Sequence, residues 1–263
     1  MSAPSTNDPY RRLDYRRQIA WPKRIERESP FLMSELGRAP VRSVIDLGCG
    51  TGEHARHFAA NGFRATGIDR SREQIETARE YEDECGALGP RFLCGEMADL
   101  PTLTSARFGA AICLGNVLPH LDEDDLTDAL SALASRMHEK GRLIAQIVNY
   151  ERLARRSDRH LPINVREDPE SSGEIVFLRL LKADGDRHVL FYPSTLLLRP
   201  GATPPLEVKA SAEVRLRAWR LHELREAFAA QGFRIDGVYG DMEAGLFDEA
   251  EAADLVVTAA LES

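Results

Sequence analysis

The nine residues VIDLGCGTG, at positions 44–52, place three glycines and an acidic residue directly after a short apolar run. The apolar run is typical of a strand buried in a parallel sheet. Gly48, Gly50 and Gly52 allow the backbone to turn sharply and allow a ligand to approach where no Cβ stands in the way. A helix beginning near Thr51 offers unpaired N–H groups to a negative group. The stretch therefore predicts a ligand site at the end of a buried strand.

Patterns of strand and helix alternate on both sides of this stretch, throughout residues 40–150. Such alternation predicts an α/β fold, with parallel strands joined by right-handed crossovers into a doubly wound sheet. The ligands of such sheets bind beyond the carboxyl ends of the strands, where the glycines lie. The predicted strands are 43–48, 64–69, one within 90–100, 108–116 and 142–150, and the predicted helices are 52–62, 71–86 (with Ser71 as N-cap) and 122–141.

The alternation of strand and helix patterns stops at both ends of this region. Residues 15–36 have a helical composition, which we expect Pro30 to interrupt. Residues 173–217 predict an antiparallel insertion with a hairpin at Asp184–Gly185 and a third strand at 206–219. Residues 157–173 have the composition of a mobile loop, for which we consider a gating role. A helix at 220–232 and strands at 234–240 and 254–261 then resume the α/β pattern.

The composition restricts the partners and the location that we expect. The 263 residues carry a net charge of -8, which disfavours nucleic acid and anionic membranes as partners. No run of eighteen apolar residues is present, and the N-terminal residues lack the apolar region of a secretory signal. We expect a cytoplasmic protein whose cysteines are buried thiols, because none of them forms a CxxC pair: Cys49, Cys85, Cys94 and Cys113.

Two acidic residues narrow the choice of ligand. Asp46 stands two residues before a G-x-G-x-G pattern, whereas the dinucleotide fingerprint is G-x-G-x-x-G. A carboxylate at that place would lie badly beside a pyrophosphate, but it suits the α-amino group of a zwitterionic ligand. Asp69 ends the next strand and could bind both hydroxyls of a ribose, as acids in NAD sites also do. Glu96 and Met97 follow the third strand, where they suit the amino group and the ring of an adenine.

The segments DLGCGTG, GIDRS and GEMADLP, in that order, resemble the first three motifs of class I S-adenosylmethionine-dependent methyltransferases. The resemblance implies a seven-stranded, mostly parallel sheet whose last strand is antiparallel, and S-adenosylmethionine as cofactor. The sequence departs from the family at Glu96, where aspartate is more common. The implied cofactor-binding residues are Asp46, Gly48, Cys49, Gly50, Gly52, Asp69, Arg70, Glu96, Met97 and Leu114.

Three further segments, ICLGNVLPHL, IVNYERL and VYGDM, are similar to those of the glycine N-methyltransferase group and its bacterial small-molecule relatives. This similarity implies that the methyl group passes to a nitrogen, or to an oxygen, of a small molecule such as an amino acid or amine. Asn149 would contact the substrate, and an arginine of the insertion would pair with its carboxylate. The implied substrate residues are Asn116, Asn149, Tyr150 and either Arg215 or Arg217.

The segment before residue 40 is predicted to fold over the cofactor. The expected organisation is a helical lid at 1–39, a methyltransferase domain at 40–156 and 218–263, and a substrate cover at 157–217. Tyr15, Trp21 and Arg24 or Arg27 would close on the ligands, an arginine taking the methionyl carboxylate.

His120 follows the fourth strand and is either a general base or a residue that shapes the pocket. His54 and His57, three residues apart, lack an acidic third ligand and are interpreted as non-metal residues. Two rival functions remain at this point: a catalytically inert protein that binds S-adenosylmethionine, and a nicotinamide oxidoreductase. The motif N-P-P-[YF], typical of methyltransferases that act on nucleic-acid bases, is absent after the fourth strand.

Overall fold

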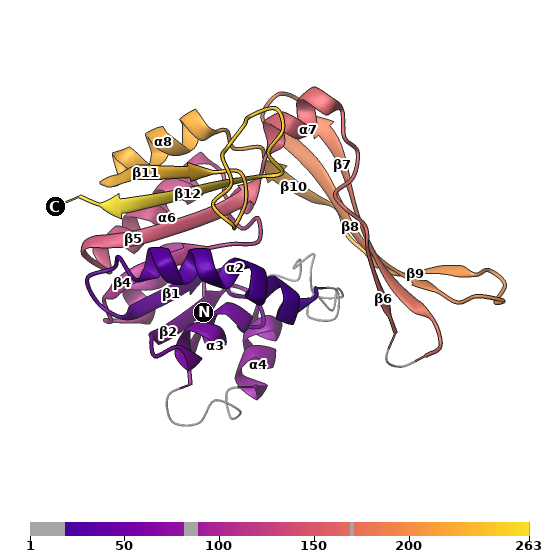
Figure 1. Cartoon of the computed structure of the whole chain (residues 1–263), viewed down its shortest axis with the longest axis horizontal. Helices are drawn as coiled ribbons and strands as arrows, with labels where there is room; N and C mark the ends of the chain where they lie inside the picture. Colours follow the sequence, from indigo (N-terminus) through magenta and orange to yellow (C-terminus); the bar gives the residue numbers. More distant parts are fainter. Residues whose placement is uncertain (1–18, 82–88, 169–170, 263) are drawn as a thin grey trace. The chain divides into compact units, whose positions relative to one another are not determined.

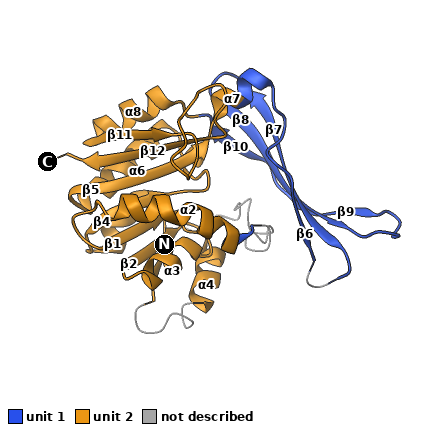
Figure 2. Cartoon of the chain, in the orientation of Figure 1, with its two compact units in different colours: residues 1–21, 153–218 blue, residues 22–152, 219–263 orange. Residues whose placement is uncertain are grey.

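The computed structural model describes residues 19–81, 89–168 and 171–262, and it divides into two compact units (Figure 2). The larger unit comprises Pro22–Arg152 and Trp219–Ser263. The smaller unit comprises Leu153–Ala218 and the residues up to Trp21. Within the described residues, no helix is long and apolar enough to cross a membrane.

The larger unit is built on a seven-stranded sheet with the order β11-β12-β5-β4-β1-β2-β3 (Figure 1). The first five strands are parallel, while β12 runs antiparallel to both β5 and β11. The predicted fold class is therefore confirmed, including the single reversed strand. The bounds are β1 Ser43–Leu47, β2 Arg64–Asp69, β3 Arg91–Cys94, β4 Phe108–Cys113, β5 Met137–Val148, β11 Phe233–Tyr239 and β12 Asp254–Leu261.

Helices cover both faces of this sheet. One hydrophobic cluster joins side chains of α2, α3 and α4 to β-strand residues of one face, among them Val44, Ile112 and Val256. Figure 1 draws α2 across this face and α6 behind the sheet. Crossovers on opposite faces on either side of β1 create the switch point at the carboxyl end of that strand. The helices are α2 Trp21–Leu36, α3 Glu53–Ala60, α4 Arg72–Glu80, α5 Leu100–Leu103, α6 Glu123–Ser135, α7 Tyr150–Arg156 and α8 Leu221–Ala230, with short 3₁₀ turns at η2 Met97–Asp99 and η3 Leu118–His120.

The helix α2 continues through Pro30, so the expected interruption at this residue is wrong. Phe31, Leu32 and Leu36 are buried in the core cluster directly after the proline. Their burial offsets the lost backbone hydrogen bond, since each buried side chain of this size contributes roughly 1.5–3 kcal/mol. The second half of α2 is therefore part of the core of the larger unit.

A buried ionic cluster fastens α2 to the sheet. Arg142, at 3% exposure, donates to Glu35 at 2.7 Å and to the two carboxylate oxygens of Asp236 at 2.6 and 2.9 Å. Arg38 also donates to Glu35 at 3.0 Å. Burial alone would lower the pKa of Arg142, but the hydrogen bonds and charges of Asp236 and Glu35 raise it. The cluster therefore keeps its charges and ties α2 to β5 and β11.

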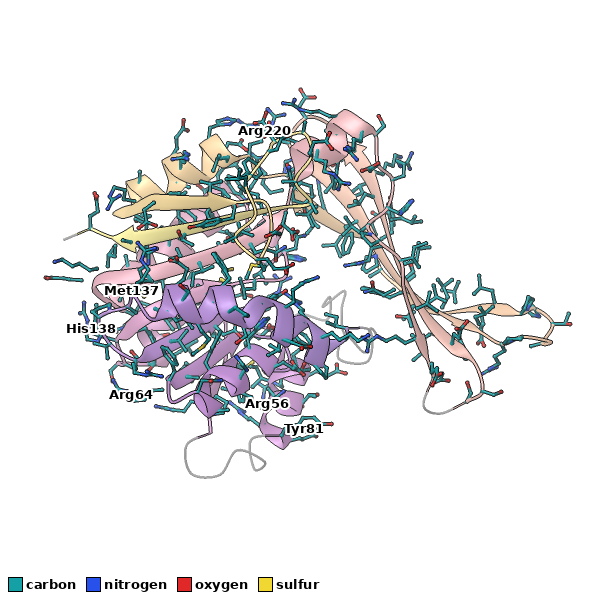
Figure 3. All side chains as sticks on the ribbon, viewed as in Figure 1. Arg56, Arg64, Tyr81, Met137, His138 and Arg220 are labelled. Atoms are coloured by element: carbon teal, nitrogen blue, oxygen red, sulfur yellow. The ribbon has the colours of Figure 1, made fainter. Side chains whose placement is uncertain are left out.

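The helix α6 ends at Ser135, six residues before the predicted end at Gly141. Residues 137–140 instead begin β5, where Met137 pairs with Phe108 of β4 (Met137 and His138 are labelled in Figure 3). Both of these side chains are almost fully buried. Local sequence favoured the helix, but the gain from burying Met137 beside the sheet decides the boundary.

The smaller unit is a five-stranded antiparallel sheet, in the order β10-β8-β7-β6 with β9 also paired to β8. The hairpin predicted at Asp184–Gly185 is present, with a positive φ of 71° at Gly185. The single strand expected at 206–219 is instead two strands, and the predicted loop at 157–173 contains β6, which pairs with β7. The bounds are β6 Asn164–Glu167, β7 Glu174–Asp184, β8 His188–Leu198, β9 Leu206–Ser211 and β10 Val214–Arg217.

Candidate functional site

The glycine loop lies between β1 and α3, and its three glycines have left-handed backbones. The φ angles are 73° at Gly48, 53° at Gly50 and 84° at Gly52. A Cβ on Gly48 would stand 2.7 Å from the methyl groups of Val117. A Cβ on Gly50, by contrast, would meet only a side-chain oxygen at 4.0 Å among the described residues. Gly50 is thus the point of the loop where another molecule can approach the backbone.

Asp46 belongs to β1, the strand that leads into this loop, and it is buried, with 3% of its surface exposed. Its Oδ2 atom has no hydrogen-bond partner among the described residues. Burial first, and the negative charge of Asp69 second, raise the pKa of Asp46 to about 8. A buried carboxylate without a partner is costly. A positively charged ligand group would remove that cost, so the site is suited to a cation.

Asp69, at the end of β2, holds the glycine loop closed. One carboxylate oxygen accepts from the Gly50 N–H at 2.9 Å, and the other accepts from the Ser71 N–H at 2.8 Å. A carboxylate offers about four lone-pair positions, so both oxygens can still accept from hydroxyl groups. Ser71 is the N-cap of α4, as predicted, with its Oγ accepting from the Gln74 N–H.

The residues predicted to meet an adenine follow the adjacent strand. Asp69 is in register with Cys94, and the Gly95 N–H donates to the Asp69 carbonyl at 3.0 Å. The next two residues, Glu96 and Met97, are exposed and partly buried, respectively. They therefore follow β3, which β2 separates from β1 and its glycine loop. Of the other predicted cofactor residues, Arg70 is exposed, whereas Cys49 and Leu114 are buried in the core.

Arg56 braces the glycine loop from α3. Its guanidinium donates to the Thr51 carbonyl at 2.7 Å and to the Ala78 carbonyl at 3.3 Å. It also forms an ion pair with Glu53 at 3.3 Å. Figure 3 shows Arg56 beside Tyr81, where the guanidinium carbon lies 5.7 Å from the ring centroid. The loop is therefore held in place by contacts that the motif itself does not encode.

On the side of α2, Glu28 contacts both Arg24 and His54, a connection that the sequence did not predict. Arg24 donates through Nε to Glu28 at 2.9 Å, and His54 contacts the other oxygen of Glu28 at 3.0 Å. Arg24 and Trp21, both predicted to contact the cofactor, are partly buried, while Arg27 is exposed. A helical i, i+4 spacing between Arg24 and Glu28 was visible in the sequence, but the contact with His54 was not.

The residues after β4 and β5 contact one another. The Asn116 side-chain amide donates to the Tyr150 hydroxyl at 2.8 Å, and its oxygen accepts from the Val148 N–H at 2.9 Å. Burial raises the pKa of Tyr150 well above its ordinary value. His120 ends the short 3₁₀ turn after β4 and is partly buried. The structure thus brings the predicted substrate residues Asn116 and Tyr150 together.

Asn149 is 3% exposed, and its hydrogen bonds go to the protein itself. Its amide donates to the carbonyls of Glu249 and Ala252 at 3.1 and 2.9 Å, and its oxygen accepts from the Arg152 N–H. These contacts anchor the segment 241–253 and cap α7. The predicted substrate contact of Asn149 remains a prediction, and the structure gives this side chain an anchoring role in addition.

The two arginines predicted on the insertion differ in their surroundings. Arg215 is exposed and donates to Asp184 at 2.6 Å, whereas Arg217 is buried and donates to the Arg187 carbonyl at 3.1 Å. Tyr15 lies outside the described residues. Within residues 19–81, 89–168 and 171–262, no group of three acidic, histidine or cysteine side chains is arranged to hold a metal ion.

Known proteins resemble this chain over its strand–helix region. A family model described as "Methyltransferase domain" matches residues 44–141. A glycine/sarcosine N-methyltransferase of Parasynechococcus marenigrum is 33% identical over 141 residues, which are 52% of this chain and 49% of that protein. An O-methyltransferase of Aspergillus nomiae is 35% identical over 125 residues, 45% of this chain and 54% of that protein. The chain thus matches about half the length of these curated relatives.

The fold extends the likeness to the whole chain. The crystal structure of an S-adenosylmethionine-dependent methyltransferase from Clostridium acetobutylicum superimposes with a TM-score of 0.75 at 18% identity, covering 97% of this chain and 96% of that one. The family match starts in β1 and contains the glycine loop, Asp69, Glu96 and Met97, and the sheet has the strand order and single reversed strand expected for such an enzyme. Residues 44–141 are therefore similar to the methyltransferase-domain family, and the whole chain has the fold of an S-adenosylmethionine-dependent methyltransferase of known structure.

Proposed function

We propose that this protein binds S-adenosylmethionine at the glycine loop and transfers its methyl group to a nitrogen of a small molecule. An amino acid or an amine is the favoured acceptor, and oxygen is the second candidate acceptor atom. One observation carries the proposal: the buried Asp46 carboxylate has an oxygen unpartnered among the described residues, and it stands in β1 four residues before the open Gly50 backbone. S-adenosylmethionine brings an ammonium group and a flat nucleoside, which are the features that such a site accepts.

Each part of the cofactor has a candidate partner in the larger unit. Asp46 would accept from the α-ammonium, and Asp69 would accept from the ribose hydroxyls. Glu96 and the Met97 N–H would bind the adenine edge, and the Arg24 guanidinium would bind the methionyl carboxylate. These assignments are consistent with the exposure of three of the residues, because Asp69 and Met97 are partly buried and Glu96 is exposed.

When bound, S-adenosylmethionine supplies a methyl group that its positive sulfur makes electrophilic, and an uncharged acceptor nitrogen takes that methyl. The protein's task is mainly alignment, which can contribute roughly 7–11 kcal/mol to lowering a barrier. An amine must lose its proton before it reacts, so a nearby acceptor helps. His120 is the candidate base, and Asn116 with Tyr150 would line the acceptor side.

The curated relatives support, in part, the choice of acceptor atom. The glycine/sarcosine N-methyltransferase favours nitrogen, whereas the O-methyltransferase keeps oxygen open. The lid at residues 1–39, the substrate cover at 157–217 and a carboxylate contact by Arg215 or Arg217 remain predictions. So does a cytoplasmic location, with which the free thiols of Cys49, Cys94 and Cys113 are consistent.

Calorimetry with S-adenosylmethionine and S-adenosylhomocysteine tests the binding step. We expect both to bind, with Asp46→Asn weakening both, and NADH to give no heat. Transfer of a labelled methyl group to glycine, sarcosine, simple amines and hydroxylated acceptors then tests catalysis. Failure of both cofactor forms to bind would refute the proposal. Binding without transfer to any acceptor would favour the inert binding protein instead.

A further inference from the structure

Glu28 is a buried carboxylate that joins α2 to the start of α3. It is 2% exposed, and each of its oxygens contacts a different residue. Oε1 accepts from Arg24 Nε at 2.9 Å and from Arg27 Nη2 at 3.4 Å, and Oε2 lies 3.0 Å from His54 Nε2. His54 is the second residue after Gly52, in the first turn of α3. A single side chain therefore connects an arginine of α2 with the helix that leaves the glycine loop.

The charge states of Glu28 and His54 determine which ring nitrogen of His54 carries the proton. Burial alone would raise the pKa of Glu28, but His54 and Arg24 together lower it to about 2, so Glu28 is a carboxylate that only accepts. Burial lowers the pKa of His54, so its imidazole is neutral at physiological pH. The proton of the neutral ring must lie on Nε2, where it is donated to Glu28. His54 and Arg24 thus both donate to the same carboxylate.

The guanidinium of Arg24 lies against the backbone that follows β4. Its terminal nitrogens lie 3.8 and 3.9 Å from the position that a Cβ on Gly115 would take. Gly115 follows β4, and its N–H donates to the Gln146 side chain at 2.8 Å. The positive charge of Arg24 also opposes the rise in the pKa of Asp46, as expected for two side chains that lie near one another. Arg24 therefore lies where a ligand that contacts Asp46 would present its carboxylate.

We propose that Glu28 and His54 are positioning residues, which hold Arg24 in the orientation that receives the carboxylate of the bound cofactor. This inference rests on the proposed function. The Glu28 carboxylate fixes the Nε side of the guanidinium, and His54 fixes the carboxylate. An arginine on an exposed helix samples many rotamers, and ordering it costs free energy at the moment of binding. Because the buried Glu28–His54 pair already orders Arg24 in the free protein, ligand binding does not include that cost.

The test compares two ligands that differ in the part that Arg24 would bind. S-adenosylhomocysteine carries the amino-acid group, whereas 5′-methylthioadenosine lacks it. Glu28→Gln and His54→Leu are expected to weaken S-adenosylhomocysteine about tenfold, the size of one charge-assisted hydrogen bond, and to leave 5′-methylthioadenosine within about twofold. His54→Gln, whose amide can still donate, should recover much of the loss. In an Arg24→Ala background, Glu28→Gln should have no further effect.

Two matched variants separate positioning from general support of the helices. His57 lies one turn further along α3 and contacts Ser29 of α2 at 2.7 Å, so His57→Leu also removes a link between these helices. Glu26→Gln removes an exposed charge from α2. Both should bind the two ligands as the unchanged protein does. Equal weakening of both ligands by Glu28→Gln, or a further loss in the Arg24→Ala background, would overturn the inference.

The outcomes distinguish this inference from the function on which it rests. If the unchanged protein binds neither ligand, the proposed function fails. If it binds S-adenosylhomocysteine and neither Glu28→Gln nor His54→Leu weakens it, only the positioning role fails. Where these variants do not fold, the ¹⁵N signals of His54 in the unchanged protein decide. They should report an Nε2–H ring that shifts with S-adenosylhomocysteine and not with 5′-methylthioadenosine, and a ring that responds equally to both would refute the role.

Discussion

Replacing Asp46 by asparagine should make the ligand-free protein more stable and make it a weaker binder of the cofactor. The pKa of Asp46 rises from 3.8 to about 8 in the folded protein, first through burial and then through the charge of Asp69. An acid whose pKa is raised on folding costs stability once the pH exceeds its unfolded value, and the cost grows until the folded value is passed. That cost is about 4 kcal/mol at pH 7 and about 6 kcal/mol above pH 8.

The asparagine variant cannot ionise, so it should escape this cost. At pH 5 the cost in the unchanged protein is only about 1–2 kcal/mol, so the melting temperatures of the two proteins should differ by only a few degrees. At pH 8 the variant should melt higher, by about 2–4 °C for each kcal/mol. Thermal unfolding between pH 5 and pH 8 measures the difference. Asp128→Asn, which removes an exposed carboxylate from α6, is the control and should show no pH-dependent gain.

The same substitution should weaken S-adenosylhomocysteine about ten- to one-hundredfold, because a charge-assisted hydrogen bond to the ammonium is lost. In the unchanged protein the affinity should rise with pH up to about pH 8, since binding requires the ionised carboxylate and releases its proton. Calorimetry in buffers of different ionisation enthalpy detects that proton. The reasoning is refuted if the variant is not stabilised at pH 8, or if its affinity keeps the same rise with pH.

Three further predictions concern the surroundings of the site. Gly50→Ala should cost about 1–2 kcal/mol of folding stability, because a side chain disfavours φ of 53°, and should also weaken S-adenosylhomocysteine, as denaturant unfolding and calorimetry can show. Asn149→Ala should loosen the segment 241–253 and destabilise the protein by about 1–3 kcal/mol; hydrogen exchange at those residues should increase, and unchanged exchange would contradict the anchoring role. Arg142→Met should destabilise by about 3 kcal/mol, because it removes the buried partner of Glu35 and Asp236 and leaves only the exposed Arg38 to pair with them; equal denaturation midpoints would argue against this.

The parallel sheet and the glycine loop could be predicted because their signals are local. Each strand of the doubly wound region is a short apolar run, and Gly48, Gly50 and Gly52 have the positive φ that the pattern requires. Ser71 caps α4 through its own side chain, a contact that spans three residues. Features of this kind depend on neighbours in the chain, so one sequence is enough to predict them.

The boundaries that were wrong depend on contacts between distant residues. Pro30 lies inside α2 because the residues after it are buried against the sheet. Met137 leaves the helix pattern because it pairs with Phe108, and β6 forms because β7 offers an edge to it. Secondary-structure propensity and hydrophobic periodicity describe local sequence only. They do not include the free energy that contacts with residues far along the chain contribute.

The sequence by itself determined the fold class, the resemblance to methyltransferases, and the acidic residues and glycines that we propose bind a cofactor. Only the tertiary structure decided how those groups are supported. It packed α2 against α3, so that Glu28 reaches Arg24 and His54, and it buried Asp46 deeply enough to raise its pKa. The physical reason is that burial and charge pairing depend on contacts between helices and strands that are distant in the sequence. These contacts form only when the chain folds.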